Sequence, residues 1–531
     1  MNSKNTTSMP ELPRISDYVA HWAAQTPDRT SFRFGDEEGS YAELSSTVER
    51  WARAMLASGI TKGDRVSMLS TPRPEYVFSF LAAVSIGAIW VGLNPRYTPA
   101  EVTRTLRDAE PSLIFTLKSF EGADLSATLQ QASAEADSKA RLVIFGGADD
   151  GYETLDSFLA GGGTVTSAEL DQARKDVGPS DPALIVYTSG STGVPKGAMI
   201  PHRGLCFGYR IQNEHFGLTG GSMLCNLPIN HIGCVGDLTC GPLVAGGTVV
   251  FMERFDPQAI LDAVIENTVD CMLGIPTTLQ IISELPNFPA ADFSKVRRVC
   301  WGGAAMPANV LARYRAKGAP LGLTYGMSEV PGSITMSLPD ADDRELTETV
   351  GHPVEQLDIR LVNDDEEVCS TGEEGEVRVK HDSILMGYYK RPEATCEAFD
   401  ENGYFRTGDI GVLEPDGTMR LVGRKKDMFK SGGYNVYPRE IEMVLEQHPQ
   451  IATAAVVAVP DPTWQEVGWA FVIAPSDADP DKIREELYDL CKNLLANYKR
   501  PKRVIVRGQL PMLPVGKVDK VQLKQEALSE S

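Results

Sequence analysis

Short apolar runs separated by longer amphipathic segments make up the first 350 or so residues of the chain. The spacing of apolar residues predicts a helix over residues 41–58, and the apolar runs predict buried strands. These strands are 65–69, 113–115, 142–145, 184–187, 249–252, 271–274 and 299–301. Helices that alternate with wholly apolar strands are typical of an α/β architecture with covered, mostly parallel sheets.

Residues 76–93 carry no charge, and the segment is long enough to suggest a membrane span. Serine and glycine residues interrupt it, and Asn94 and Pro95 follow it at once. We therefore predict a buried helix, a turn near Gly87 and a buried strand over 88–93, and no integral membrane segment.

The pattern changes after about residue 351. Four short strands separated by turn sequences, at 358–362, 375–379, 411–413 and 419–421, predict a small β-rich subdomain. A dense charge cluster at 424–427 follows. Beyond it, a helix over 438–448, a strand over 453–459 and a helix over 482–495 indicate a compact α+β unit. We expect an N-terminal domain of residues 1–423, a hinge at 424–427 and a C-terminal domain of residues 428–531.

Composition narrows the possible partners. The formal net charge of -21 argues against nucleic acids and anionic membrane surfaces. None of the nine cysteines forms a C-x-x-C pair, which favours reduced, buried thiols over disulfides or a zinc site. The first ten residues lack the apolar core of a signal peptide, so we expect a cytoplasmic protein.

The stretch 188–197, T-S-G-S-T-G-V-P-K-G, follows one of the predicted strands. Its glycines, hydroxyl residues and single lysine can direct backbone N–H groups and a positive charge toward a polyanion, most naturally a nucleotide phosphate. It is not a Walker A loop, because Pro195 precedes Lys196 and Gly197 follows it. A plain flexible loop is the alternative.

Six further motifs follow in order along the chain. They are L-P-I-N-H-I-G at 227–233, G-G-A-A-M-P at 302–307, Y-G-M-S-E at 325–329, Y-F-R-T-G-D at 404–409, G-R-K-K-D-M-F-K-S-G-G-Y-N-V-Y-P at 423–438 and P-M-L-P-V-G-K-V-D-K at 511–520. Together with the 188–197 loop they resemble the adenylate-forming (ANL) superfamily, which includes acyl- and aryl-CoA synthetases, nonribosomal adenylation domains and beetle luciferases. The resemblance extends from about residue 15 to about residue 525.

The resemblance implies an AMP-forming acid:CoA ligase. A carboxylate attacks the α-phosphate of Mg-ATP to give an acyl-adenylate and pyrophosphate, and the thiol of CoA then displaces AMP. ATP, Mg²⁺ and CoA are thereby implied as cofactor and co-substrates. The implied fold has a large N-terminal domain of two covered mixed sheets with a small β-barrel-like subdomain, and a mobile C-terminal α+β domain.

The resemblance also assigns the nucleotide contacts. Tyr325 is expected to stack on adenine, Ser328 to bond the α-phosphate in place of the usual threonine, and Glu329 to hold Mg²⁺. Asp409 and Arg424 match the residues that contact the ribose. The loop over the β- and γ-phosphates comprises Thr188, Ser189, Gly190, Ser191, Thr192, Gly193 and Lys196. Adenine and the rest of AMP are flanked by Gly303, Ala304, Ala305, Gly326 and Met327.

Further roles follow from the same motifs. Lys517 matches the lysine that reaches the α-phosphate and the attacking carboxylate, with Val515 in place of the usual threonine. Lys426 matches the hinge about which the C-terminal domain rotates between the two steps. The loop that then lines the tunnel for CoA is Lys430, Ser431, Gly432 and Gly433. The acyl pocket is expected to comprise His231, Ile275, Trp301, Gly302, Gly303, Gly326, Met327, Val330 and Pro331.

Alternatives stay open for several of these residues. Glu329 could alternatively be a solvated surface carboxylate. Asp409 and Arg424 could form a structural salt bridge, and His231 could be a histidine of the core. The pocket residues favour a medium-chain, branched or aryl carboxylic acid. The alternative functions are delivery of the acyl group to another acceptor such as a carrier protein, and nucleotide binding without ligase activity. The oligomeric state is also open, with a homodimer as one alternative.

Overall fold

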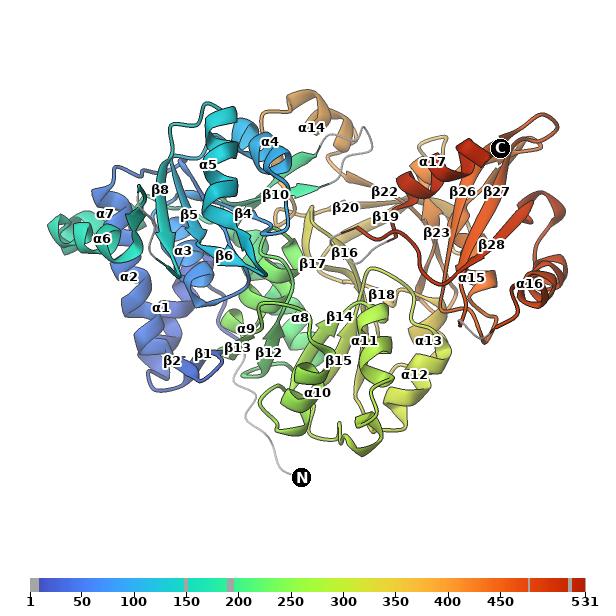
Figure 1. Ribbon diagram of the computed structural model, residues 1–531, viewed down its shortest axis with the longest axis horizontal. Coiled ribbons are helices and arrows are strands. Elements are labelled where there is room, and N and C mark those ends of the chain that lie inside the picture. The colour runs from blue at the N-terminus through green and yellow to red at the C-terminus, as the bar shows by residue number, and fades with distance from the viewer. Residues whose placement is uncertain (1–8, 148–150, 189–194, 476–477, 514–517, 531) are drawn as a thin grey trace.

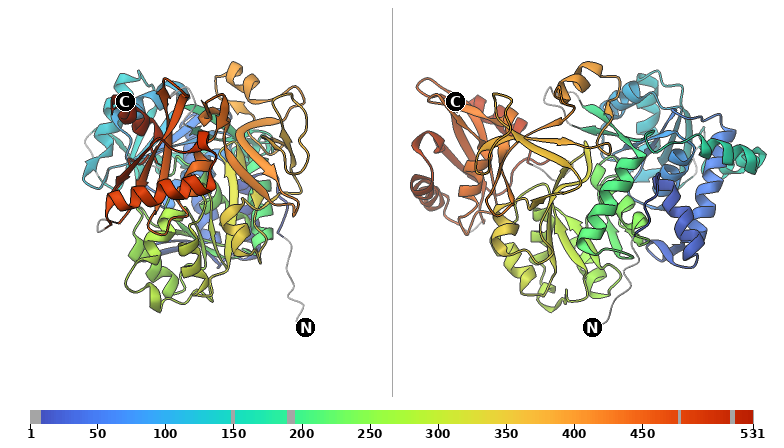
Figure 2. Two further views of the ribbon diagram at one scale, coloured as in Figure 1. Left: turned by 90° about the vertical axis from the view of Figure 1, so that its right-hand side faces the viewer. Right: turned by 180° about the vertical axis from the view of Figure 1, so that it is seen from behind.

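The computed structural model describes residues 9–147, 151–188, 195–475, 478–513 and 518–530. Two large mixed sheets, a small antiparallel sheet and a C-terminal sheet follow one another across the molecule (Figure 1). The N-terminal helices and the C-terminal elements lie at opposite ends of its long axis, as the view from behind also shows (Figure 2). The predicted α/β class, with a large N-terminal part and a smaller C-terminal part, is confirmed.

The first large sheet has the strand order β18-β17-β16-β15-β14-β12-β13-β1-β2. Its interior pairs are parallel, and antiparallel pairs lie at both edges. The strands are β1 (Thr30–Phe34), β2 (Glu37–Ser40), β12 (Ser222–Cys225), β13 (Thr248–Phe251), β14 (Cys271–Gly274), β15 (Arg298–Trp301), β16 (Leu321–Met327), β17 (Val330–Met336) and β18 (His352–Pro353).

The second large sheet has the order β21-β11-β10-β4-β3-β5-β8-β9. Only β10–β11 and β11–β21 pair antiparallel among its described strands. The strands are β3 (Arg65–Leu69), β4 (Ile89–Leu93), β5 (Leu113–Leu117), β8 (Arg141–Phe145), β9 (Glu153–Thr154), β10 (Pro182–Thr188), β11 (Lys196–Pro201) and β21 (Gly387–Tyr388), and β6 (Ser119–Phe120) and β7 (Ala123–Asp124) form a separate ribbon. The strands predicted from the apolar runs are all present.

Helices cover these sheets. They are α1 (Ile15–Gln25), α2 (Tyr41–Ala57), α3 (Pro74–Ser85), α4 (Pro99–Ala109), α5 (Leu125–Glu135), α6 (Leu155–Ala160), α7 (Ser167–Lys175), α8 (His202–Phe216), α9 (Gly241–Val244), α10 (Pro257–Ile265), α11 (Pro276–Ser283), α12 (Ala308–Arg315), α13 (Asp343–Glu348) and α14 (Pro392–Ala398). Short 3-10 helices are η1 (Gly161–Thr164), η3 (Phe288–Ala290), η4 (Lys425–Asp427) and η5 (Asn497–Lys499), and η2 (Gly233–Cys240) is a π-helix.

The charge-free segment is a core element. Almost every residue of α3 is buried, and all five residues of β4 are buried. Gly87 lies between them with φ +80°, a left-handed conformation that glycine adopts without strain. The predicted helix, turn and strand are confirmed, and no helix in the described ranges is long and apolar enough to cross a membrane.

The small sheet lies where the β-rich subdomain was predicted. Its strands are β19 (Asp358–Val362), β20 (Glu374–Lys380), β22 (Phe405–Leu413) and β23 (Met419–Arg424), paired antiparallel in that linear order. Register places Asp409 on β22 directly opposite Arg424 on β23.

The C-terminal sheet is covered on both faces. Its strands are β24 (Phe429–Ser431), β25 (Tyr434–Val436), β26 (Thr453–Asp461), β27 (Gln465–Ile473) and β28 (Arg503–Arg507), and its helices are α15 (Pro438–Leu445), α16 (Pro480–Leu494) and α17 (Lys520–Glu530). Alternation along β26 sends Val456 to a cluster with α15 and α16, and Val457 to a cluster with α17.

The C-terminal elements meet the rest of the molecule through a sparse junction. Within the described parts of the chain, no hydrogen bond or ion pair joins residues 9–423 to residues 428–530. The contact is apolar: Tyr437 packs against Ile410, Val412 and Val422. All nine cysteines are free thiols, and seven of them are buried.

Candidate active site

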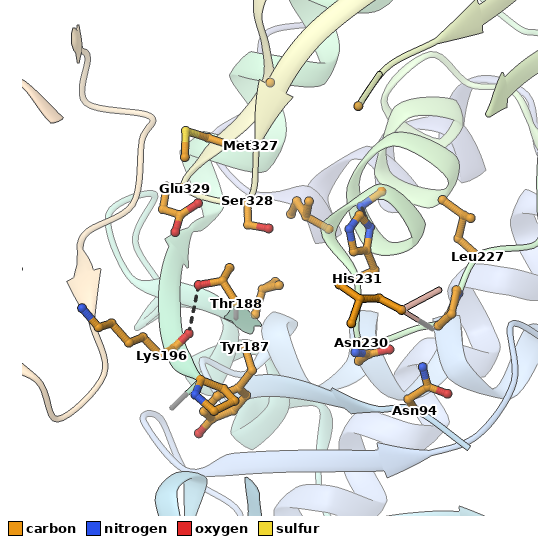
Figure 3. Close-up of a pocket in the computed structure, with 18 of the residues that line it drawn as sticks. Asn94, Tyr187, Thr188, Lys196, Leu227, Asn230, His231, Met327, Ser328 and Glu329 are labelled. Carbon is orange, nitrogen blue, oxygen red and sulfur yellow. Dashed lines mark hydrogen bonds between the residues drawn. The ribbon is translucent and has the colours of Figure 1, made fainter. Parts of the chain in front are cut away.

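One large cavity of about 1360 Å³ gathers most of the predicted motifs. Its wall includes the ends of β10, β11 and β16, the start of η2, the turn before η2, residues of β22 and β23, and η4. Figure 3 shows Ser328 and Glu329 on one side of it, and His231, Asn230 and Asn94 on the other. The cavity therefore has one end rich in phosphate-binding residue types and another built from the turn before η2.

Ser328 and Glu329 form the two-residue turn of a hairpin. Met327 on β16 pairs with Val330 on β17, so only these two residues connect the strands. A two-residue connection fixes the backbone tightly. It presents the Ser328 hydroxyl and the Glu329 carboxylate at one point of the cavity wall.

Glu329 is not the solvated surface carboxylate of the alternative interpretation, because only 6% of it is exposed. Burial raises the pKa of its carboxyl, and a hydrogen bond of 3.0 Å from the Tyr388 hydroxyl to Oε1 acts in the opposite direction. The hydroxyl of Thr188 also lowers this pKa. The carboxylate is thus held within the site by the Tyr388 hydroxyl.

The ends of the predicted phosphate loop lie side by side. Thr188 on β10 pairs with Lys196 on β11, and the Thr188 hydroxyl donates to the Lys196 carbonyl at 3.4 Å (Figure 3). The Lys196 ammonium lies 5.4 Å from the centre of the Tyr388 ring, a cation–π distance. No carboxylate of the described residues pairs with this ammonium, which lies on a side chain that lines the cavity.

Tyr325, Asp409 and Arg424 form a connected cluster. The Tyr325 hydroxyl donates to Asp409 Oδ2 at 2.7 Å, and Arg424 Nε lies 2.8 Å from Asp409 Oδ1. The Asp409 side chain is 6% exposed, and that of Arg424 is 44% exposed. Burial and the neighbouring Asp409 carboxylate raise the pKa of Tyr325, so its hydroxyl stays protonated.

His231 and Asn230 lie at the other end of the cavity. His231 Nδ1 accepts a hydrogen bond of 3.0 Å from the Gly233 N–H, and the Asn230 amide donates to the Tyr97 hydroxyl at 2.9 Å. Both side chains line the cavity. His231 is therefore placed at its wall and is not enclosed in the core.

Six of the nine residues predicted for the acyl pocket line the cavity. These six are His231, Ile275, Gly302, Gly303, Gly326 and Met327. Trp301, Val330 and Pro331 are buried away from it. This is a correction with a simple cause, since alternation along β15 directs the Trp301 side chain into the core between β15 and the helices α10 to α12. Ala304 is exposed, and Ala305 is half-buried.

Two segments of the C-terminal motifs are placed differently relative to the cavity. Lys426 lines it, and so does Leu513, which lies four positions before Lys517. Gly432 and Gly433 form an exposed two-residue turn between β24 and β25, with φ +59° and +87°, and do not line the cavity. Lys430 is exposed and Ser431 is buried, also away from it.

Some predicted residues lie outside the described ranges. They are Ser189, Gly190, Ser191, Thr192, Gly193 and Lys517. Their roles remain sequence predictions.

Sequence reasoning missed several residues at the cavity. Tyr388 contacts both Glu329 and Lys196 but lies 59 positions from the first of these. Asp237 and Tyr209 also line the cavity. Asp237 lies shortly after the 227–233 motif, but no local pattern indicates a role for any of the three residues.

No cluster of three or more His, Cys, Asp or Glu side chains that could hold a metal occurs in the described ranges. The oxygen donors at the phosphate end are the Glu329 carboxylate and the hydroxyls of Ser328 and Thr188. Mg²⁺ prefers such hard oxygen ligands and retains waters and phosphate oxygens in its shell. This donor set therefore fits Mg²⁺ that arrives with a nucleotide.

Comparison with known proteins covers almost the whole chain. The sequence model described as "AMP-binding enzyme" matches residues 19–389, and that of the "AMP-binding enzyme C-terminal domain" matches residues 440–517. A feruloyl-CoA synthase from Amycolatopsis sp. is 34% identical over 521 residues, covering 96% of this chain and 98% of the relative.

Two further relatives are similar over comparable lengths. An indoleacetate–CoA ligase from Aromatoleum aromaticum is 31% identical, with 96% of this chain and 98% of the relative covered. Among solved structures, ATP-bound MatB from Rhodopseudomonas palustris superposes with a TM-score of 0.84 at 27% identity, covering 96% of this chain and 98% of that one.

Proposed function

This chain belongs to the AMP-binding enzyme family, and we propose that it is an ATP-dependent acid:CoA ligase. It would join a medium-chain, branched or aryl carboxylic acid to AMP and then transfer the acyl group to CoA. The main support for the proposal is that the residues expected to bind phosphate, Lys196, Ser328 and Glu329, line the same cavity as His231, which is expected at the mouth of the acyl pocket. The names of relatives that act as CoA ligases support the second step.

The Tyr325–Asp409–Arg424 cluster would bind the nucleoside. A buried carboxylate that is already fixed by a tyrosine and an arginine can accept hydrogen bonds from both ribose hydroxyls without reorganising. The backbone of Gly302 and Gly303, which line the cavity, would flank adenine, where small residues permit close approach. Tyr325 is buried between the cavity-lining residues Thr324 and Gly326, and it would stack on the base.

Adenylation is a displacement at phosphorus, which depends mainly on alignment and charge neutralisation. Lys196 and Ser328 would contact phosphate oxygens, and Glu329 with Thr188 would hold Mg²⁺ at the same end. When bound, the metal would offset negative charge on the triphosphate. His231, at the opposite wall, would mark the entrance of the acyl pocket, so that the acid's carboxylate faces the α-phosphate.

The position of Leu513 supports the adenylating arrangement of the C-terminal elements. Leu513 lines the cavity, and Lys517 follows it by four residues, whereas the Gly432–Gly433 turn is remote from the cavity. Rotation about Lys426 would withdraw Lys517 and bring the glycine turn in for CoA transfer. The absence of hydrogen bonds and ion pairs across the described junction lowers the cost of this rotation. We accordingly retain the boundaries 1–423, 424–427 and 428–531.

Reduced thiols favour a cytoplasmic location, because most of the cysteines are buried and none is paired. Burial protects seven of the nine thiols from reagents. The proposal therefore places ATP, CoA and the acid in the same reducing compartment.

The deciding experiment measures pyrophosphate release by the purified protein with pooled carboxylic acids, with and without CoA, and identifies products by mass spectrometry. Acid-dependent pyrophosphate release and a CoA thioester are expected. Adenylate without thioester would instead indicate another acceptor, and no acid-dependent release would favour a nucleotide-binding protein without ligase activity. Glu329→Gln should abolish most release, and Glu348→Gln, an exposed carboxylate on α13, is the matched control.

A further inference from the structure

The cavity wall contains a carboxylate that has no role in the proposed adenylation and CoA-transfer steps. Asp237 lies on the π-helix η2 and lines the cavity. The carboxyl group is buried, yet part of the residue's surface remains accessible. This accessible surface belongs to the cavity wall. π-Helical turns are rare and are frequent at functional sites.

No positively charged group compensates the negative charge of the Asp237 carboxylate within the described residues. No ion pair between described residues includes Asp237, and no cation contributes to its pKa. Burial raises this pKa to about 7, and a hydrogen bond from the Gln212 side chain on α8 only partly opposes the shift. A carboxylate buried without a counter-charge is costly unless another group supplies hydrogen bonds.

Tyr209 on α8 is a second buried polar residue at the cavity wall. The residue is 1% exposed, its side chain lines the cavity, and its pKa is raised by burial and then by the neighbouring Asp237. No group in the described part of the chain accepts a hydrogen bond from its hydroxyl. The hydroxyl lies against Gly236, where a Cβ would approach to 1.7 Å, so a side chain at that position would displace it.

Two buried polar groups without adequate partners thus border one cavity. Buried polar groups without partners destabilise a protein, and native proteins retain them where a ligand or water completes their hydrogen bonds. The Asp237 carboxylate accepts hydrogen bonds from Gln212 and from its own backbone N–H but has no cationic partner among the described residues, and the Tyr209 hydroxyl lacks an acceptor there. A ligand group that both donates and accepts would satisfy the two together.

We propose that Asp237 and Tyr209 form a recognition site for the non-reacting end of the acyl group, and that the preferred acids carry a hydroxyl group there. The inference rests on the proposed ligase function and specifies its substrate class. An alcohol or phenol hydroxyl donates to Asp237 and accepts from Tyr209. An ammonium group can only donate and leaves Tyr209 without an acceptor, and a methyl group leaves both unsatisfied.

The test uses matched pairs of straight-chain and aryl acids that differ only in a terminal methyl or hydroxyl group, with an ammonium-bearing member for each. Pyrophosphate release gives kcat/KM for each acid. Sites built to bond a hydroxyl discriminate strongly against analogues that lack it. At least one pair should therefore show a hydroxyl preference of roughly tenfold or more, the scale of one hydrogen bond to a charged group.

Substitutions at Asp237 and Tyr209 test whether these residues cause the preference for hydroxyl-bearing acids. Asp237→Leu should abolish or reverse the hydroxyl-to-methyl ratio, Tyr209→Phe should reduce it, and Asp237→Asn should give an intermediate ratio. The control is Asp262→Asn on α10, whose carboxylate bonds only to Gln258 in the described chain and does not line the cavity. It should keep the wild-type ratio. Melting curves accompany each variant.

Each outcome is decisive. Wild-type protein that activates methyl and hydroxyl acids equally, or prefers the methyl or ammonium member, overturns the recognition site but leaves the ligase proposal intact. A folded Asp237→Leu variant with an unchanged ratio does the same. If no acid of any pair supports pyrophosphate release, the ligase proposal itself fails. The wild-type comparison decides the matter even where a variant does not fold.

Discussion

Replacing Asp409 by Asn tests the nucleoside site most directly, because it removes one charge with almost no change in volume. The carboxylate is 2.7 Å from the Tyr325 hydroxyl and 2.8 Å from Arg424 Nε. In the proposed complex it also accepts bonds from the ribose. A hydrogen bond to a charged group contributes about 1.5–3 kcal/mol. With about 1.4 kcal/mol per factor of ten, we expect KM for ATP to rise roughly 10- to 100-fold.

The free energy of unfolding should fall by less than the loss of a fully buried pair would cause. Breaking such a pair costs about 3–5 kcal/mol. Here the Arg424 side chain is 44% exposed and can be solvated, and the new amide oxygen still accepts from Tyr325. We therefore expect a loss of about 1–3 kcal/mol, measured by urea unfolding.

A matched control lies in the same small sheet. Asp358 also accepts a hydrogen bond from a tyrosine, Tyr404, and pairs with an arginine, Arg360, but this arginine does not line the cavity, whereas Arg424, the partner of Asp409, does. Asp358→Asn should leave KM for ATP unchanged in the pyrophosphate assay. The reasoning is refuted if folded Asp409→Asn protein keeps the wild-type KM for ATP, or if KM for the acid rises as much as KM for ATP.

Four further predictions concern the two half-reactions. Lys517→Ala should slow adenylation by about a hundredfold but spare thioester formation from supplied acyl-adenylate; equal losses would contradict the rotation. Glu329→Gln should raise the Mg²⁺ requirement in a magnesium titration, whereas Glu348→Gln should not. Lys426→Pro should retain single-turnover adenylate formation and lose CoA transfer, because proline restricts the pivot; wild-type thioester release would exclude Lys426 as the hinge. Gly432→Ala should impair CoA transfer, since φ is +59° and a Cβ would lie 2.7 Å from Trp464; normal transfer would show the turn is dispensable.

Local sequence patterns predicted most of the helices and strands of the fold. The apolar run at 65–69 coincides with β3, and the charge-free segment divides into α3 and β4 around Gly87. These elements are recognisable because their residues are buried whatever lies beside them. The π-helix η2 was not predicted, since an apolar run does not reveal an extra residue in a helical turn.

The site was predictable only where one motif supplied all its members. The Ser328–Glu329 turn lies within a single motif, and the register of β22 and β23 then joins two others through Asp409 and Arg424. Tyr388 reaches Glu329 from a distant strand, so no spacing rule could have indicated it. The Trp301 error has the opposite origin: its motif lies beside the cavity, but strand alternation sends that side chain into the core.

The sparse junction makes the C-terminal segment a replaceable part. With no hydrogen bond or ion pair across it among the described residues, a graft from a relative has to match little more than the surface under Tyr437. One position is strict: a Cβ on Gly423 would lie 2.9 Å from Tyr437 Cβ. Chimeras that preserve this glycine–tyrosine contact are therefore expected to assemble, and the acid that such an enzyme accepts should follow the parent that contributes residues 1–423.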